Sequence, residues 1–184
     1  MDLYARYFIP FPVIVTGRLT LRRIERRDLA DLYEYCRRED SCRYSEWSPH
    51  QSRLETRRYI AWMQRRYADR EGLTFAVECE GRVIGTASYI GFDESYGTVE
   101  IGYGIRSDYW GRGLGREIVN ALVWYAFETV GAQRVSARVL PENTRSAALL
   151  TACGFTCEGV HRRSLFLKGK YRDVAVYAKL KEQP

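Results

Sequence analysis

The sequence is poor in the residue types on which several common kinds of site depend. It contains only two histidines, His50 and His161, and its five cysteines include no pair with Cys-x-x-Cys spacing. No metal site is expected, because structural zinc sites use closely spaced cysteine and histidine ligands. Hydrolysis by a serine or cysteine nucleophile would need one of the two histidines as its base, and neither lies in a supporting motif.

Two further absences bear on the cell compartment. The cysteines are odd in number and scattered, which argues against the disulfide framework of a secreted protein. The early apolar run at residues 7–15 is interrupted by Pro10 and Pro12. It is shorter than the roughly 20 residues that a membrane helix needs, and no signal-peptide pattern is present. The sequence therefore predicts a cytoplasmic protein without a membrane partner.

The composition is typical of one globular domain. Hydrophobic residues make up 46% of the 184 residues and charged residues 28%, which suits a packed core. No repeat, low-complexity tract or linker divides the chain, so a single domain over residues 1–184 is expected. The net charge of +6 is modest. Since no basic stripe interleaved with aromatic residues accompanies it, a nucleic-acid partner is not expected.

The hydrophobic periodicity predicts a chain that mixes strands and helices. Alternating or apolar runs between turn residues predict strands, within residues 13–23, 74–78, 82–90, 98–105, 134–140, 156–162 and 173–180. Apolar residues three and four apart predict helices: one that Asp28 caps, one after the capping box at Ser52, one that contains Leu114, Ile118 and Leu122, and one that opens at residues 141–143. Residues 39–51 are polar and irregular and indicate a loop. This order of elements predicts an α+β protein with a mixed sheet.

The most informative segment is Gly111-Arg-Gly-Leu-Gly-Arg116, between a predicted strand and a predicted helix. Glycine lets the backbone approach a ligand, and the first N–H groups of a helix have no acceptor within it. The helix dipole also favours anions at this end, and Arg112 and Arg116 add positive charge. The segment therefore predicts a phosphate-binding turn, although glycine also serves ordinary tight turns.

Three kinds of nucleotide site contain such a turn. The first is a Walker loop, which ends in Gly-Lys-Ser/Thr; here Gly115 is followed by Arg116-Glu117, so a Walker loop is excluded. The second is a dinucleotide site, whose fingerprint has Gly or Ala where this chain has Arg116; only Glu142 after the next strand supports a dinucleotide site. The third is a coenzyme A site, with the pyrophosphate at the helix start and the pantetheine arm along a neighbouring strand.

Several motifs follow one another in a specific order. They are Thr16-Gly-Arg-Leu-Thr-Leu-Arg22, Glu100-Ile-Gly-Tyr103, Tyr109-Trp-Gly-Arg-Gly-Leu-Gly115, Glu142-Asn-x-x-Ser146, Gly154-Phe155, Glu158-Gly159 and Asp173-Val-Ala-Val-Tyr177. Together they span nearly the whole chain, which resembles the GNAT superfamily of acyl-CoA N-acyltransferases and, within it, the RimJ/RimL-like group. Trp110 departs from the Gln or Arg of many members, but an aromatic residue is common there in this group.

The resemblance implies a twisted, mostly antiparallel sheet, flanked by helices and splayed between its fourth and fifth strands, here 98–105 and 134–140. The co-substrate acetyl-CoA would enter this splay. Gly102 and Gly104 interrupt the first of these strands, which indicates a bulge or a close ligand. The residues expected to bind acetyl-CoA are Gly102, Tyr103, Gly104, Ile105, Trp110, Gly111, Arg112, Gly113, Leu114, Gly115, Arg116, Asn143 and Ser146.

Transfer of an acetyl group from a thioester to an amine needs a neutral amine and a proton for the leaving thiolate. Glu100 is the candidate base, directly or through water, and the equal alternative is a structural role, in a pair with an arginine or as an acceptor for backbone N–H groups. Ser146 is the candidate donor to the thiolate, because leucines replace the tyrosine that many superfamily members carry slightly later. Asn143 and Ser146 could instead cap their helix. Cys153 is expected to be a buried thiol and not a nucleophile.

The sequence thus predicts an acetyl-CoA-dependent N-acetyltransferase that works by direct transfer in a ternary complex. The resemblance points first to the α-amine of a protein or peptide N-terminus, of the ribosomal-protein type. The alternatives are a small-amine acceptor such as a polyamine or aminoglycoside, and a non-catalytic acyl-CoA-binding module. The acceptor pocket would be built from residues 39–51 and the final hairpin around residues 168–172. Monomer and homodimer both stay open.

Overall fold

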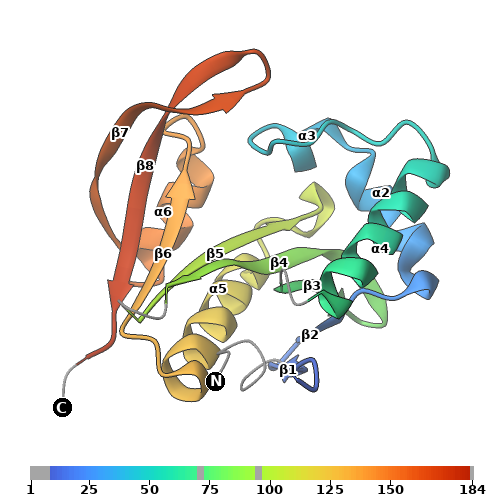
Figure 1. Cartoon of the computed structure of the whole chain (residues 1–184), viewed down its shortest axis with the longest axis horizontal. Helices are drawn as coiled ribbons and strands as arrows, with labels where there is room; N and C mark the ends of the chain where they lie inside the picture. Colours follow the sequence, from blue (N-terminus) through green and yellow to red (C-terminus); the bar gives the residue numbers. More distant parts are fainter. Residues whose placement is uncertain (1–8, 70–72, 94–96, 183–184) are drawn as a thin grey trace.

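The computed structural model describes residues 9–69, 73–93 and 97–182 (Figure 1). One sheet contains eight strands, in the order β1-β2-β3-β4-β5-β6-β8-β7. The strands are β1 (Ile14–Val15), β2 (Leu19–Arg23), β3 (Leu73–Cys79), β4 (Arg82–Asp93), β5 (Thr98–Ile105), β6 (Arg134–Val139), β7 (Thr156–Leu167) and β8 (Lys170–Leu180). The helices are α2 (Leu29–Cys36), α3 (Glu39–Cys42), α4 (Arg53–Ala68), α5 (Leu114–Trp124) and α6 (Thr144–Ala152), with the short segments η1 (Arg26–Asp28), η2 (Ser107–Tyr109) and η3 (Tyr125–Val130).

The sheet is antiparallel except where β5 meets β6, and there the two strands separate. Their parallel pairing ends at Glu100 opposite Ser136. β5 continues to Ile105 and β6 to Val139, so their later halves diverge (Figure 1). The predicted splayed, mostly antiparallel sheet is therefore confirmed. The splayed strands are numbered fifth and sixth because residues 13–23 form a two-stranded hairpin instead of one strand.

Helices cover both faces of the sheet. Successive side chains of a strand point to opposite faces, and Phe75 and Val77 of β3 pack in the cluster that contains α5. Ala76, between them, packs with residues of α2 and α4. Among the described segments, no helix is long and apolar enough to cross a membrane.

The start and the end of α5 agree with the glycine pattern. Gly113 precedes the helix with φ 78°, and Gly131 ends its last turn, η3, with φ 79°. Both values lie in the left-handed region, which glycine adopts without strain. Leu114, Ile118 and Leu122 are buried, as their spacing predicts.

Two expectations near the N-terminal half are wrong. Asp28 does not cap α2 with its side chain; its carboxylate accepts hydrogen bonds from Arg22 at 2.8 and 2.9 Å and from the Glu25 N–H at 2.8 Å. The nearby guanidinium is a stronger partner than a helix N–H, because both groups are charged. Residues 39–51 are not entirely a loop, since residues 39–42 form the single turn α3.

The bulge that Gly102 and Gly104 indicate is not on β5. Both glycines pair in regular register with Ser88 and Thr86 of β4, and the register shift lies on β4 between Tyr89 and Gly91. The glycines leave room for other side chains: a Cβ on Gly104 would lie 2.6 Å from the Tyr35 hydroxyl oxygen. The close approach comes from a distant segment, which the strand's own sequence does not reveal.

The final hairpin is longer than its periodicity predicts. Its strands pair from Thr156 opposite Ala178 to Leu167 opposite Lys170, with a register shift between His161 and Leu165. Arg163 within this shift has φ 50°. The irregularity breaks the alternation of apolar and polar residues, so the sequence pattern predicts strands that are shorter than those of the structure.

Candidate active site

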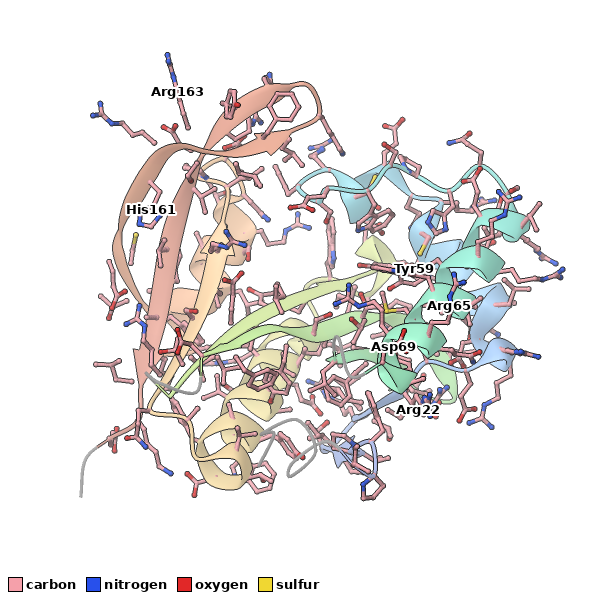
Figure 2. All side chains as sticks on the ribbon, in the orientation of Figure 1. Arg22, Tyr59, Arg65, Asp69, His161 and Arg163 are labelled. Atoms are coloured by element: carbon pink, nitrogen blue, oxygen red, sulfur yellow. The ribbon has the colours of Figure 1, made fainter. Side chains whose placement is uncertain are left out.

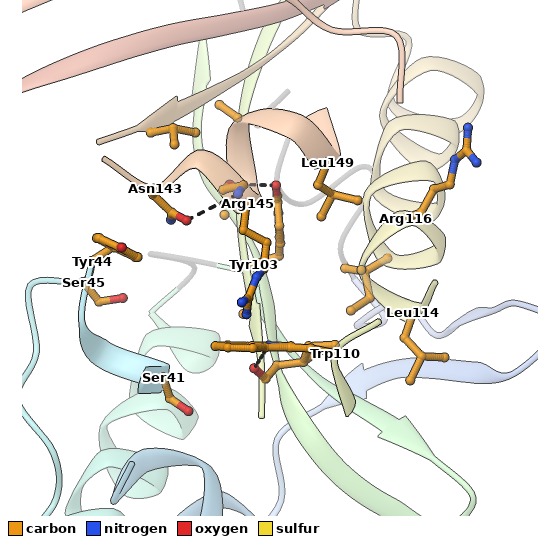
Figure 3. Close-up of a pocket in the computed structure, with 18 of the residues that line it drawn as sticks. Ser41, Tyr44, Ser45, Tyr103, Trp110, Leu114, Arg116, Asn143, Arg145 and Leu149 are labelled. Atoms are coloured by element: carbon orange, nitrogen blue, oxygen red, sulfur yellow. Dashed lines mark hydrogen bonds between the residues drawn. The ribbon is translucent and has the colours of Figure 1, made fainter. Parts of the chain in front are cut away.

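A cavity of about 780 Å³ opens where β5 and β6 separate. Figure 3 shows Ser41, Tyr44 and Ser45 at one side, and Leu114 and Arg116 on α5 at the other. The remaining wall is formed by the later half of β5, by β6 and by the start of α6. The structure therefore brings together segments that lie far apart in the sequence.

All but one of the predicted cofactor-binding residues line this cavity, in the segments 102–105, 110–111 and 113–116 and at Asn143 and Ser146. Arg112 is the exception. Its backbone oxygen accepts a hydrogen bond from Arg18 at 2.8 Å, and its guanidinium lies 5.1 Å from the centre of the Tyr109 ring. Arg112 thus stabilises the turn and does not line the cavity.

The glycine-rich turn leaves the start of α5 uncovered by side chains. Gly111 and Gly113 have φ 75° and 78°, and no side chain caps the helix. The first N–H groups of an uncapped helix of this length are free to bind an anion. These groups belong to cavity-lining residues, so the turn fits the pyrophosphate of coenzyme A.

Arg18 neutralises the one carboxylate in the first turn of α5. The Glu117 carboxylate accepts hydrogen bonds from the Arg18 Nε and backbone N–H, each at 2.8 Å, and from the Thr16 hydroxyl. Burial alone would raise the pKa of Glu117, but these hydrogen bonds lower it below its ordinary value. A phosphate at this helix end is therefore not repelled by Glu117. Sequence reasoning missed this role of Arg18, although the residue lies in a quoted motif.

Trp110 and Arg145 meet across the splay. The Trp110 indole N–H donates to the Ile105 carbonyl at 3.0 Å, which anchors the ring to the end of β5. The Arg145 guanidinium, from the first turn of α6, lies 3.6 Å from the centre of this ring (Figure 3). Such a cation–π contact is favourable. Arg145 lines the cavity and was not among the residues expected there.

The two polar residues at the start of α6 have different partners. Asn143 is the cap, because its side chain accepts the Ser146 N–H at 3.3 Å. The Ser146 hydroxyl instead lies 3.0 Å from the Tyr103 hydroxyl of β5 (Figure 3). Burial raises the pKa of Tyr103 to about 12, with the Ser146 hydrogen bond acting in the opposite direction. Tyr103 therefore keeps its proton at neutral pH, a property that its position in the sequence does not reveal.

Glu100 lies at the point where the strands separate but does not line the cavity. Its Oε1 accepts a hydrogen bond from the Arg138 Nε at 2.9 Å, and its side chain is 24% exposed. The arginine pair that the sequence left as an alternative is thus present. It occupies one carboxylate oxygen, and among the described residues the other has no partner.

The final hairpin contacts two other segments near the cavity. Lys168 donates to the carbonyl of Cys42, the last residue of α3, at 2.8 Å, and Arg172 forms an ion pair with Glu142, which precedes α6. Residues 40–41 and 43–45 line the cavity, whereas residues 168–172 do not. The expected acceptor wall is therefore found on one side only.

The family model for the acetyltransferase (GNAT) domain matches residues 18–156, from the start of β2 to the start of β7. The match contains the glycine-rich turn, both splayed strands and the start of α6. This chain belongs to the GNAT acetyltransferase family.

Relatives extend the likeness over most of this GNAT acetyltransferase. It is 31% identical to the N-acetyltransferase p20 of Bacillus licheniformis, over 92% of this chain and 97% of that protein. It is 29% identical to the ribosomal protein uS5 alanine N-acetyltransferase of Escherichia coli (90% and 89%) and 26% identical to the spermidine N(1)-acetyltransferase of Vibrio cholerae (87% and 91%). The crystal structure of a GNAT acetyltransferase from Bacillus anthracis covers 92% of this chain and 98% of its own, with a TM-score of 0.80 at 24% identity.

Cys153 of the GNAT domain is buried, as its sequence context predicts. It is 5% exposed, and burial raises the pKa of its thiol. A protonated, inaccessible thiol is a poor nucleophile. Cys153 is therefore not placed to act as a nucleophile.

The separate partners of Asn143 and Ser146 predict separate effects. Asn143→Ala removes the cap of α6 and should lower the free energy of unfolding by about 1 kcal/mol. Ser146→Ala keeps the cap and should lower kcat about tenfold at nearly unchanged stability, because it removes the hydroxyl beside Tyr103. Thermal unfolding and steady-state kinetics of both variants test this. Equal turnover with lower stability in Ser146→Ala would show that Ser146 is structural.

Proposed function

We propose that this GNAT domain transfers the acetyl group of acetyl-CoA to the α-amine at the N-terminus of a protein or peptide. The charge around the cavity is the observation that carries this choice of acceptor. Four arginines line the cavity, Arg43, Arg116, Arg138 and Arg145, and among the described residues Asp40 is the only carboxylate that does so. A peptide N-terminus brings a single amine together with carbonyl and carboxylate acceptors for such donors.

The same charges disfavour a polyamine or aminoglycoside. These acceptors carry several positive charges, and each positive charge would need a carboxylate partner in the cleft. Like charges placed next to one another cost binding free energy and thereby exclude ligands. The spermidine acetyltransferase relative keeps this alternative open, but the cavity offers a polycation one carboxylate against four guanidinium groups.

Acetyl-CoA supplies the acetyl group as a thioester. The residues that fit its pyrophosphate are the uncapped first turn of α5 and the turn at Gly111 and Gly113. The later half of β5 fits the pantetheine arm, because none of the described strands pairs with its backbone on the side of the splay beyond Glu100. The Asn143 and Ser146 side chains complete this wall from α6.

Two proton transfers accompany the transfer of the acetyl group. The acceptor amine loses a proton as the C–N bond forms. Glu100, which Arg138 holds in place, accepts this proton through a water. The sulfur gains a proton as the C–S bond breaks, and it comes from the hydrogen-bonded pair of hydroxyls of Tyr103 and Ser146, both of which line the cavity. An acceptor on newly made protein would place this reaction in the cytoplasm.

The experiment is a thiol-release assay with acetyl-CoA against peptides with free α-amines, the same peptides with blocked N-termini, spermidine and an aminoglycoside. Turnover with free peptides alone supports the proposal. Faster turnover with spermidine would contradict the proposed peptide acceptor and indicate a polyamine acceptor instead. Coenzyme A binding without thiol release from any amine would favour a non-catalytic acyl-CoA-binding module.

Glu100→Gln tests the base. We expect kcat to fall about tenfold at pH 7, less than the roughly hundredfold of a directly acting base, because the carboxylate does not line the cavity. Raising the pH should partly restore the rate, because more of an α-amine of pKa about 8 is then neutral. Pre-steady-state and steady-state rates from pH 6 to 9 measure this. A wild-type rate throughout would leave Glu100 with only its structural pair.

A further inference from the structure

A second cavity, of about 240 Å³, lies between α2, α4 and the sheet. Its wall is a row of aromatic rings: Tyr35, Trp47, His50, Tyr59 and Trp62, in which each ring centre is 5.8 to 6.2 Å from the next. Figure 2 shows Tyr59 on the side of α4 that faces the strands. A cavity of roughly 150 Å³ is enough to hold benzene, so this one has room for a single ring.

Hydroxyl groups line the sheet side of this cavity. Thr74, Thr86 and Ser88 come from β3 and β4, and the Ser88 hydroxyl donates to that of Thr74 at 3.0 Å. His50 is held by a hydrogen bond of 2.9 Å between its Nδ1 and the Thr56 hydroxyl. The wall therefore combines ring faces with a few fixed polar groups, which is the composition typical of small-molecule sites.

The charges around the second cavity indicate whether a ring that binds there is charged or uncharged. None of the described residues that line it is Asp, Glu, Lys or Arg. Burial lowers the pKa of His50, against the opposing effect of Glu55, so the imidazole is neutral at pH 7. Neither a cation nor an anion would find a group of opposite charge among these lining residues, so the occupant is uncharged.

The second cavity adjoins β5, the strand that contains Glu100 and Tyr103. The Tyr35 hydroxyl oxygen lies over Gly104, and Ser88 and Thr86 pair with Gly102 and Gly104. Both glycines line the first cavity. The two cavities therefore adjoin the same part of β5, where Gly102 and Gly104 have no side chains and the Tyr35 hydroxyl covers Gly104.

We propose that the second cavity receives an uncharged aromatic ring of the acceptor, from a residue close to the N-terminus that is acetylated. The assignment of the ring to the acceptor rests on the proposed function, whereas the binding of the ring does not. Burial of an aromatic side chain among other rings adds affinity beyond its area alone, and this would select acceptors by sequence.

Met63 reports on this cavity directly. The chain has two methionines, Met1 and Met63, and Met63 lines the cavity. Titration of ¹³C-methyl-methionine protein with p-cresol should shift the Met63 signal in a saturable manner, because the ring current of a bound aromatic ring changes the local field at the methyl group. Tetramethylammonium should leave the signal in place. The absence of a saturable shift with p-cresol, or a shift with tetramethylammonium instead, would overturn the proposal.

Two variants localise the ring. Trp62→Ala removes a ring that is 44% exposed, and it should weaken p-cresol binding about threefold to tenfold. Trp124→Ala is the matched control, because Trp124 is 59% exposed on α5 and lines neither cavity. Ser88→Leu fills the cavity from β4 and should abolish the shift. Equal p-cresol affinities in Trp62→Ala and Trp124→Ala would overturn the proposal.

The acceptor assignment has its own measurement. Peptides with free α-amines and phenylalanine at position two, three or four are compared with peptides that carry leucine there. One phenylalanine position should raise kcat/KM about tenfold, and Trp62→Ala but not Trp124→Ala should remove the gain. Equal rates for every pair would overturn the acceptor assignment. If no peptide were acetylated, the proposed function would fail, while the p-cresol titration would still decide whether the cavity binds a ring.

Discussion

Gly113→Val is expected to weaken coenzyme A binding about a hundredfold, or about 2.8 kcal/mol, in a protein that remains folded. Gly113 has φ 78°, a conformation that costs a residue with a side chain about 1–2 kcal/mol. Its Cβ would lie 3.5 Å from the Arg18 guanidinium, which holds both the Arg112 carbonyl and Glu117. Valine therefore strains the turn, crowds its stabilising arginine and lifts the backbone N–H groups away from the pyrophosphate.

Gly81→Val is the matched control for this variant. Gly81 has φ 74° in the turn between β3 and β4, and a Cβ there would meet no atom within 4 Å. It should lose similar stability and keep its affinity for coenzyme A. Calorimetric titration of both variants, with thermal unfolding alongside, separates strain from binding. Unchanged affinity in Gly113→Val would place the pyrophosphate elsewhere.

The parts of this fold that the sequence predicted are those set by local chemistry. β5 spans residues 98–105 as its alternation indicates, and α5 begins at Leu114, where its apolar spacing begins. These features and the glycine turn depend on backbone conformation, which nearby residues largely determine. The splay and the expected cofactor-binding residues, all but one of which line the cavity, were instead implied by the resemblance to the GNAT superfamily.

The parts that the sequence did not predict depend on contacts between distant segments. Arg18 reaches Glu117 from the turn before β2, and Tyr35 of α2 covers Gly104 of β5. In each case the partner is chosen by the packing of the sheet, so periodicity and spacing contain no signal for it.

The Tyr103–Ser146 pair is the clearest example in the active site. Sequence reasoning assigned proton donation to Ser146 alone, because no tyrosine follows on α6. The structure supplies a tyrosine hydroxyl from β5 instead, 3.0 Å from Ser146 across the splay. A phenol and a hydroxyl in hydrogen-bond contact can act as one donor unit, in which the effects of separate substitutions are not additive.

Tyr103→Phe is expected to lower kcat about a hundredfold, the lower end of the range for loss of a general acid or base. The ring remains, so the packing on the β5 side and the KM for acetyl-CoA should change little. Because burial raises the pKa of Tyr103 to about 12, the phenol is protonated throughout pH 6–10. The ratio of wild-type to variant kcat should therefore be constant over this range, whereas the ratio for Glu100→Gln should fall as the pH rises.

Tyr33→Phe is the control for Tyr103→Phe, because Tyr33 on α2 lines neither cavity and its loss of a hydroxyl should leave kcat unchanged. In the double variant Tyr103→Phe with Ser146→Ala, kcat should be close to that of Tyr103→Phe alone, since Ser146 contributes through the tyrosine. Multiplied losses in the double variant would show two independent groups. A wild-type kcat in Tyr103→Phe would remove the tyrosine from the reaction and return proton donation to Ser146 or to water.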